Sequence, residues 1–228
     1  MTGFRAKSLA SVPERPRERL LAQGAQVLTA SELLAIILRT GVTGCDAVSL
    51  GQHLIDKFGG LRGLLAAEAD ALLAVHGLGM AKVAELLAIS EINRRALEER
   101  LQAGKLMDQP DTVRQYCMAR LGHLRIEHCV ALYLDSQYRL IVCEEVSRGT
   151  LTQASVYPRE IIKAALHHHA AALILAHNHP SGVSEPSRAD LALTRHLRKA
   201  LALVDVRLLD HLIVTANEAT SLAELGQL

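Results

Sequence analysis

Large aromatic side chains are scarce in this chain. Its 228 residues include no tryptophan, and aromatic residues make up only 3% of the sequence. Half of the residues are hydrophobic all the same, so the core must be built mainly from Leu, Ala, Val and Ile. A chain of this length can form two small domains or one large one.

Closely spaced cysteine pairs are also missing. No Cys-x-x-Cys pair occurs among the four cysteines, which are Cys45, Cys117, Cys129 and Cys143. This spacing argues against a disulfide framework and against a cysteine-type zinc knuckle. We therefore expect buried free thiols in a reducing cytoplasm.

Charge of one sign and long apolar runs are absent as well. The formal net charge is +1, which argues against a strongly basic nucleic-acid-binding protein. No apolar run reaches the length that spans a membrane, and residues 1–19 are too polar for a signal peptide. These absences predict a cytoplasmic protein without a membrane contact.

The character of the chain changes near residue 105. Residues 1–105 read as a helical domain whose helices are separated by glycines, with helices predicted over residues 32–38, 46–59, 68–75 and 80–101. Ser31 and Asp46 are the expected N-caps of the first two helices. The long fourth helix is expected to bury an apolar stripe formed by Leu86, Leu87, Ile89 and Ile92.

Strands are predicted only in the second domain, residues 106–228. Residues 128–134 and 139–146 alternate as strands and flank a short turn, which indicates an antiparallel hairpin. A helix over 158–167, a buried strand over 171–176, a helix after Ser187 and a strand over 206–215 follow. The pattern predicts an α+β fold with a mixed, mostly antiparallel sheet.

A possible metal site follows the buried strand, in the run His177-Asn178-His179-Pro180. Side chains alternate along a strand, so the two histidines share one face. Asp190 falls in the first turn of the next helix, where a carboxylate is favoured. Two nitrogens and one carboxylate leave a fourth position for water, as in catalytic zinc sites. We predict one Zn²⁺ per chain, bound by His177, His179 and Asp190.

Other interpretations of these residues stay open. Ser187 and Asp190 also fit a capping box that only starts a helix. A two-histidine, one-carboxylate set can equally hold iron. The tract 167–169 is three consecutive histidines that cannot all face one ion, so we interpret it as structural. His211, beside Asp210, is either a partner of a ligand or a core residue.

The same residues resemble a known motif. His177-x-His179-Pro180 with Ser187-x-x-Asp190 is similar to the JAMM (MPN-plus) metalloprotease motif, and the surrounding residues resemble the RadC family over the whole chain. The commonest JAMM form has Ser or Thr where Asn178 stands, but that position is not a ligand. The resemblance implies a cytidine-deaminase-like α/β/α domain over residues 106–228.

The resemblance also implies catalytic roles for two further residues. The JAMM base is a Glu immediately before the first core strand, and Glu127 occupies that place; Glu144 is the alternative. Ser187 corresponds to the residue that stabilises the developing oxyanion, a task for a preorganised donor. Spacing alone does not choose among the glutamates ahead of the motif, which are Glu127, Glu144, Glu145 and Glu160.

A possible nucleic-acid motif lies in the helical domain. Residues 75–82 resemble a helix-hairpin-helix, whose glycines let backbone N–H groups approach a phosphate. Lys82, Arg94 and Arg95 would add positive charge. The simpler interpretation is a tight turn between packed helices.

Two functions follow from these patterns. The first is a zinc metallopeptidase or isopeptidase acting on a peptide or protein substrate. The alternative is a DNA-associated, repair-related accessory protein that contacts DNA through the helical domain and whose metal site is structural or vestigial. Neither the substrate nor a homo-oligomeric state can be predicted from these residues.

Overall fold

The computed structural model describes residues 15–149 and 156–228. The chain divides into two compact units, the first ending at Leu87 and the second beginning at Ala88. This division falls inside the long helix α6 (Met80–Ala103), upstream of the predicted boundary near residue 105.

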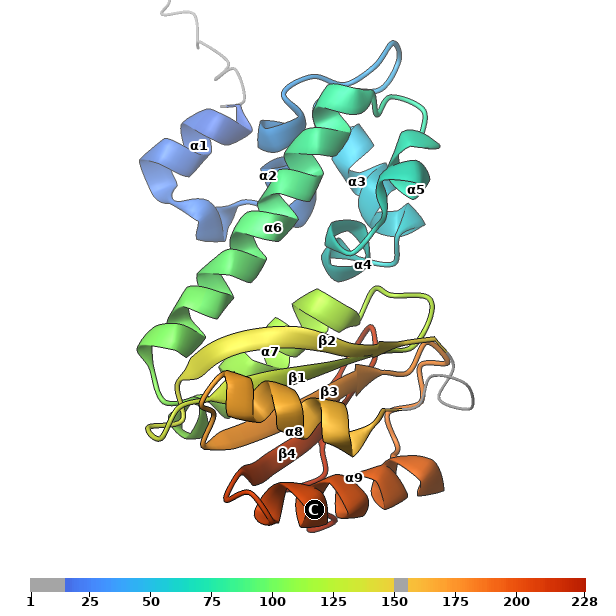
Figure 1. The fold of residues 1–228 in the computed structure, drawn as a ribbon. Coiled ribbons are helices and arrows are strands. Elements are labelled where there is room, and N and C mark those ends of the chain that lie inside the picture. The colour runs from blue at the N-terminus through green and yellow to red at the C-terminus, as the bar shows by residue number, and fades with distance from the viewer. Residues whose placement is uncertain (1–14, 150–155) are drawn as a thin grey trace, which may run out of the picture. The chain divides into compact units, whose positions relative to one another are not determined.

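The first unit is helical, as predicted. It contains a 3₁₀ turn over Ala25–Val27 and the start of α6, together with α1 (Pro16–Gln23), α2 (Ala30–Leu38), α3 (Ala47–Lys57), α4 (Leu61–Leu65) and α5 (Ala69–Leu73). Figure 1 labels the helices α1 to α6. The short helices α1 and α4 were not predicted.

Helices α2 and α3 of the first unit begin with side-chain caps. Asp46 caps α3 as predicted, accepting a hydrogen bond from the Ser49 N–H at 2.7 Å. The predicted cap Ser31 is wrong. Thr29 caps α2 instead, because its hydroxyl accepts from the Glu32 N–H while Glu32 accepts from the Thr29 N–H. This reciprocal pair starts the helix two residues earlier than the apolar pattern suggests.

Leucines form the core of the first unit. Its buried members come from α2 to α6 and are Leu34, Leu38, Leu50, Leu54, Leu64, Leu72, Val75, Leu78, Val83 and Leu86. The predicted apolar stripe of α6 is wrong for most of its length. Val83 and Leu86 are buried, whereas Leu87 and Ile92 are 37% and 66% exposed.

The second unit is built on a five-stranded mixed sheet, which confirms the predicted α+β fold. The strands are β1 (His128–Leu134), β2 (Leu140–Arg148), β3 (Ala172–Asn178), β4 (Arg207–Val214) and β5 (Ala219–Ser221), in the spatial order β2-β1-β3-β4-β5. Only the β3–β4 pair is parallel. The small edge strand β5 was not predicted.

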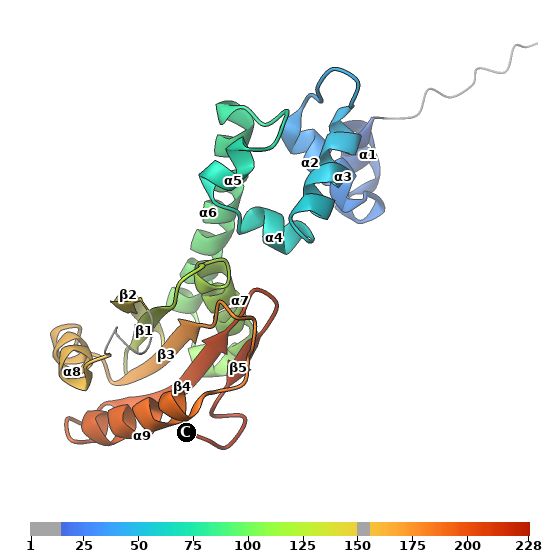
Figure 2. The ribbon, with the colours of Figure 1, turned by 90° about the vertical axis from the view of Figure 1, so that its right-hand side faces the viewer.

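Helices cover both faces of this sheet (Figure 2). The second unit also contains a 3₁₀ turn over Leu106–Asp108, and its helices are α7 (Pro110–Leu121), α8 (Pro158–His167) and α9 (Arg188–Ala202). One apolar core lies between α7 and the sheet, and a second lies between the sheet and the helices α8 and α9. Helix α8 has the predicted bounds, whereas α7 was not predicted.

A bulge in β4 decides which of its side chains meet β3 on each face. Leu173 pairs with Leu208, but Ile174 pairs with Asp210, so Leu209 is an extra residue. Asp210 therefore joins the α7 face, and His211 lies on the α9 face. That is the face to which the alternation of β3 also assigns His177.

Among the helices of the described residues, none combines the length and the hydrophobicity that crossing a bilayer requires.

Candidate metal centre

The structure brings the three predicted metal ligands together. His177 lies near the end of β3, His179 follows two residues after it, and Asp190 is the third residue of α9. The Nε2 atoms of the two histidines are 3.0 Å apart. Asp190 Oδ1 lies 3.2 Å from His177 Nε2, and its Oδ2 lies 3.4 Å from His179 Nε2. The three residues form a group that can hold a metal ion.

Asp190 has a buried oxygen that lacks a hydrogen-bond donor. Its side chain is buried, and its Oδ2 accepts a hydrogen bond from the Ser187 N–H at 2.7 Å. Within the described residues, its Oδ1 accepts none, although His177 Nε2 lies 3.2 Å away. Leaving such an oxygen unpartnered costs about 1–3 kcal/mol or more. A bound cation would supply the missing partner.

The charge state of Asp190 suits a metal ligand. Burial would raise the pKa of this carboxyl, but the neighbouring imidazoles of His177 and His179 and the contact with Ser187 outweigh burial and hold the pKa well below its usual range. Asp190 is therefore a carboxylate at neutral pH.

A backbone carbonyl fixes the proton position of His179. Its Nδ1 lies 2.7 Å from the carbonyl oxygen of Val183. A carbonyl only accepts, so Nδ1 carries the proton, and Nε2 of the neutral ring keeps a lone pair. The hydrogen bond with Asp190 raises the pKa of His179 against the effect of burial, and Val183 and the charge of Glu127 act in the same direction as Asp190.

The donor set fits a divalent metal. Ligands placed about 2.1 Å from a tetrahedral zinc are about 3.4 Å from one another. The two histidine nitrogens are 3.0 Å apart, and they lie 3.2 and 3.4 Å from Oδ1 and Oδ2 of Asp190 respectively, so the three residues are close enough together to share one ion. Two imidazoles and one carboxylate suit zinc, and they also suit non-haem iron.

The predicted base Glu127 lies immediately before β1. Cys129 pairs with His177 across β1 and β3, so extending this antiparallel register by two residues brings Glu127 opposite His179. Alternation along β1 gives Glu127 the same face as Cys129, which is the face of His177. Its electrostatic effect on His179 agrees with this position.

The alternative base Glu144 lies on β2 and is engaged elsewhere. Its Oε1 is 2.8 Å from Nε2 of His168, which follows the last residue of α8. Strand β1 separates β2 from β3. His168 is thus the residue of the histidine tract that contacts Glu144.

Ser187 caps α9. Its hydroxyl oxygen accepts a hydrogen bond from the Asp190 N–H at 3.1 Å, and the Ser187 N–H donates to Asp190 in return. Accepting this bond leaves the hydroxyl proton of the exposed Ser187 available for donation. The capping box of Ser187 and Asp190 is therefore present, and the Ser187 hydroxyl can still donate a hydrogen bond.

Three residues around the cluster were not assigned a role by sequence reasoning. Val183 orients His179, and Thr194 contacts both Asp190 and His211. Asn178 is buried, and its side chain binds the backbone of residues 124–128. His211, left open above, is a buried neighbour of His177 at 2.8 Å. Burial lowers the pKa of His211 to about 3, so it is neutral.

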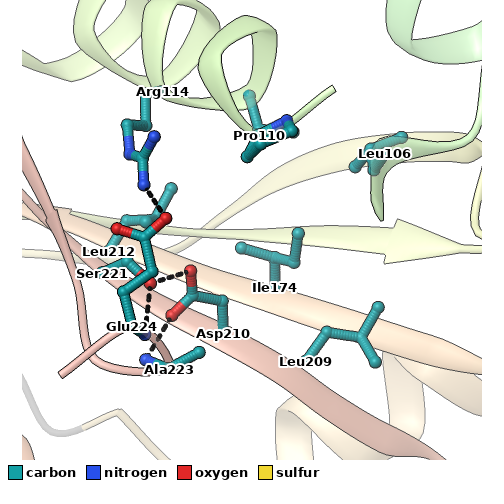
Figure 3. A pocket seen from close by; sticks show the side chains of 11 residues that line it. Leu106, Pro110, Arg114, Ile174, Leu209, Asp210, Leu212, Ser221, Ala223 and Glu224 are labelled. Atoms are coloured by element: carbon teal, nitrogen blue, oxygen red, sulfur yellow. Dashed lines mark hydrogen bonds and ion pairs between the residues drawn. The ribbon is translucent and has the colours of Figure 1, made fainter. Parts of the chain in front are cut away.

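A pocket of about 160 Å³ lies on the other face of the sheet. Figure 3 shows Ile174, Leu209 and Leu212 along its floor, with Asp210 and Arg114 at its polar end. Arg114 is paired with Glu224, and Asp210 accepts a hydrogen bond from Ser221. The pocket contains none of the three candidate ligands.

In the hairpin between α5 and α6, the lysine side chain is hydrogen-bonded to backbone carbonyl oxygens of the first unit. Lys82 donates to the carbonyl oxygens of Thr40 and Gly77, at 2.7 and 3.2 Å. Gly77 has φ +93°, and a Cβ there would lie 2.6 Å from Val42, so a glycine is required. Arg94 and Arg95 are paired with glutamates of their own helix.

Comparison with known proteins agrees with this architecture. Residues 107–227 match the RadC-like JAB domain, and residues 9–84 match the UPF0758 N-terminal family. A UPF0758 protein of Bordetella parapertussis is 58% identical over 213 residues, which are 93% of this chain and 95% of that protein. UPF0758 proteins of Variovorax paradoxus and Chromobacterium violaceum are 55% and 54% identical, over 94% and 97% of this chain and 96% and 100% of their own lengths. The chain therefore belongs to the RadC family of UPF0758 proteins.

Proposed function

We propose that this protein is a zinc-dependent hydrolase that cleaves a peptide or isopeptide bond in a peptide or protein substrate. His177, His179 and Asp190 would hold one zinc ion. The observation that carries the proposal is the buried Oδ1 of Asp190, which has no hydrogen-bond donor within the described residues and belongs to a carboxylate that lies within 3.4 Å of the Nε2 atoms of both histidines. The RadC-like JAB domain supports a hydrolase, while the names of the relatives specify no reaction.

When bound, zinc would supply a water molecule whose pKa is lowered to about 7. Glu127 would take the proton of the attacking water and pass it to the leaving amine. It is favoured over Glu144 because the register brings it opposite His179, whereas Glu144 is paired with His168. The Ser187 hydroxyl would donate a hydrogen bond to the substrate oxygen as negative charge develops there.

The metal site is tested by metal analysis of purified full-length protein. We expect about one zinc per chain, as a catalytic site of this type requires, and strong loss of zinc in Asp190→Asn. Asp205→Asn is the matched control, because Asp205 is exposed and has φ +57°, which Asn tolerates. Iron in place of zinc after anaerobic purification would contradict the assignment of the metal.

The reaction is tested with peptide and isopeptide libraries whose cleavage is read by mass spectrometry. Glu127→Gln should keep its zinc and lose hydrolysis by about 10²- to 10⁴-fold, the usual contribution of a general base. Glu144→Gln should cleave like the wild type. Zinc-loaded wild-type protein that cleaves no member of either library would defeat the proposed reaction.

A further inference from the structure

Two residues that are not candidate ligands join Asp190 to His177. The Thr194 hydroxyl contacts the backbone carbonyl of Asp190 at 2.6 Å and His211 Nδ1 at 2.6 Å. His211 Nε2 lies 2.8 Å from His177 Nδ1. Since His177 Nε2 is 3.2 Å from Asp190 Oδ1, the four residues form a closed ring of polar contacts. All four are buried, with at most 1% of each residue exposed.

The ring has one consistent set of proton positions. The carbonyl of Asp190 can only accept, so it takes the hydroxyl proton of Thr194. The Thr194 oxygen must then accept from His211, which places the His211 proton on Nδ1. Nε2 of the neutral His211 is left as an acceptor for the Nδ1 proton of His177. When the His177 ring is neutral, its Nε2 therefore keeps the lone pair, and this atom faces His179 and Asp190.

We propose that Thr194 and His211 are positioning residues that fix the tautomer of His177 for metal binding. This role rests on the proposed metal site but not on the nature of the substrate. Partners of this kind orient a ligating imidazole and make it a better ligand. The ring also links α9, which carries Asp190 and Thr194, to strands β3 and β4, which carry His177 and His211.

Loss of the Thr194 hydroxyl would reverse the proton positions on His211 and His177. Without an acceptor at Nδ1, His211 would carry its proton on Nε2 and donate it to His177 Nδ1. His177 would then carry its own proton on Nε2, next to the unpartnered Oδ1 of Asp190. A proton would occupy the position of the metal, and zinc would have to displace it.

The test compares Thr194→Val, which keeps the shape and removes the hydroxyl, with Thr194→Ser, which keeps the hydroxyl. Long-range ¹H–¹⁵N NMR of the metal-free full-length protein reports which nitrogen of His177 is protonated. We expect the proton on Nδ1 in the wild type and in Thr194→Ser, and on Nε2 in Thr194→Val. Zinc affinity, measured by competition with a chelator, should fall about 10- to 100-fold in Thr194→Val and only a few-fold in Thr194→Ser.

A proton on His177 Nε2 in the wild type would overturn the proposal without any variant. Unchanged zinc affinity and an unchanged tautomer in folded Thr194→Val would overturn it as well. If Thr194→Val does not fold, the spectra of the wild type and of Thr194→Ser still test the proposal, because both must show the proton on Nδ1 of His177. Zinc binding without hydrolysis would contradict the proposed function. The tautomer and zinc-affinity measurements would still test whether Thr194 and His211 position His177.

Discussion

At the scale of single residues, Asn178 connects the end of β3 to the segment that leads into β1. Its Oδ1 accepts a hydrogen bond from the His128 N–H at 2.7 Å. Its Nδ2 donates to the carbonyl oxygens of Leu124 and Ile126, both at 3.0 Å. The side chain thus ties down the stretch that contains Glu127. An amide satisfies all three contacts, whereas a hydroxyl at this position is too short to do so.

Asn178→Asp should uncouple the base from the metal site. The carboxylate can still accept from His128, but it would face two carbonyl oxygens without a donor. We expect a loss of about 2–4 kcal/mol in the free energy of unfolding, measured with urea, because buried groups are left unpaired. Zinc content should be retained, since no ligand is altered, while hydrolysis should fall as in Glu127→Gln. Asn217→Asp, in an exposed turn, is the control, and equal losses in both variants would refute this role of Asn178.

Ser187 is expected to contribute to stability and to catalysis separately. Ser187→Ala removes the cap of α9 and should lower the free energy of unfolding by about 1 kcal/mol. Loss of the hydroxyl donor should also lower kcat by about 10²- to 10³-fold. Thr29→Ala, which removes the capping box of α2, should match the stability loss and leave kcat unchanged. A kcat of Ser187→Ala equal to that of the wild type would reduce Ser187 to a helix cap.

The sequence predicts the candidate ligands better than it predicts the residues that position them. His177, His179 and Asp190 stand out because three metal-ligating side chains flank one strand–loop–helix junction. Thr194 and His211 carry no such signal, because their meeting depends on the parallel β3–β4 pairing and on the extra residue Leu209. Val183 contributes only a backbone oxygen, which any residue offers.

At the scale of whole elements, long apolar runs were easier to recognise than mixed ones. Strands β1 and β3 are buried along their whole length and are correctly predicted. Helix α7 was missed although Pro110 at its first position is a helix-start signal. The stripe of α6 was misassigned because its burial passes from Leu86 in the first unit to Leu97 and Leu101 in the second. A single periodic face cannot describe a helix that serves two cores.

Lys82 is expected to stabilise the hairpin between α5 and α6 rather than to bind DNA. Lys82→Met removes the donor to the carbonyls of Thr40 and Gly77, which should cost about 1–2 kcal/mol in the free energy of unfolding. Lys57→Met, at an exposed position in the last turn of α3, should cost less. If Lys82 instead contacts phosphate, Lys82→Met would lower the slope of log affinity for duplex DNA against log salt by about one. That result with unchanged stability would favour the DNA-associated alternative.

At the scale of the whole molecule, the two units have separate cores. Among residues 15–149 and 156–228, the buried core of the first unit ends at Leu86, and the buried cores of the second unit contain no residue before Leu97. The three candidate ligands all belong to the second unit. Metal binding should therefore stabilise the second unit directly. A packing defect in the first unit should weaken only the first unit.

Calorimetry of the full-length protein should resolve two unfolding transitions. Zinc at about 1,000 times its Kd stabilises the state that binds it by about 4 kcal/mol, which corresponds to a rise in Tm of roughly 10 °C. We expect this rise only in the transition of the second unit. Gly51→Ala should lower only the other transition, because a Cβ on Gly51 would lie 2.7 Å from the Ser31 carbonyl oxygen where α3 packs on α2. A single transition that moves with both zinc and Gly51→Ala would mean instead that α6, the helix shared by both units, couples them into one cooperative structure.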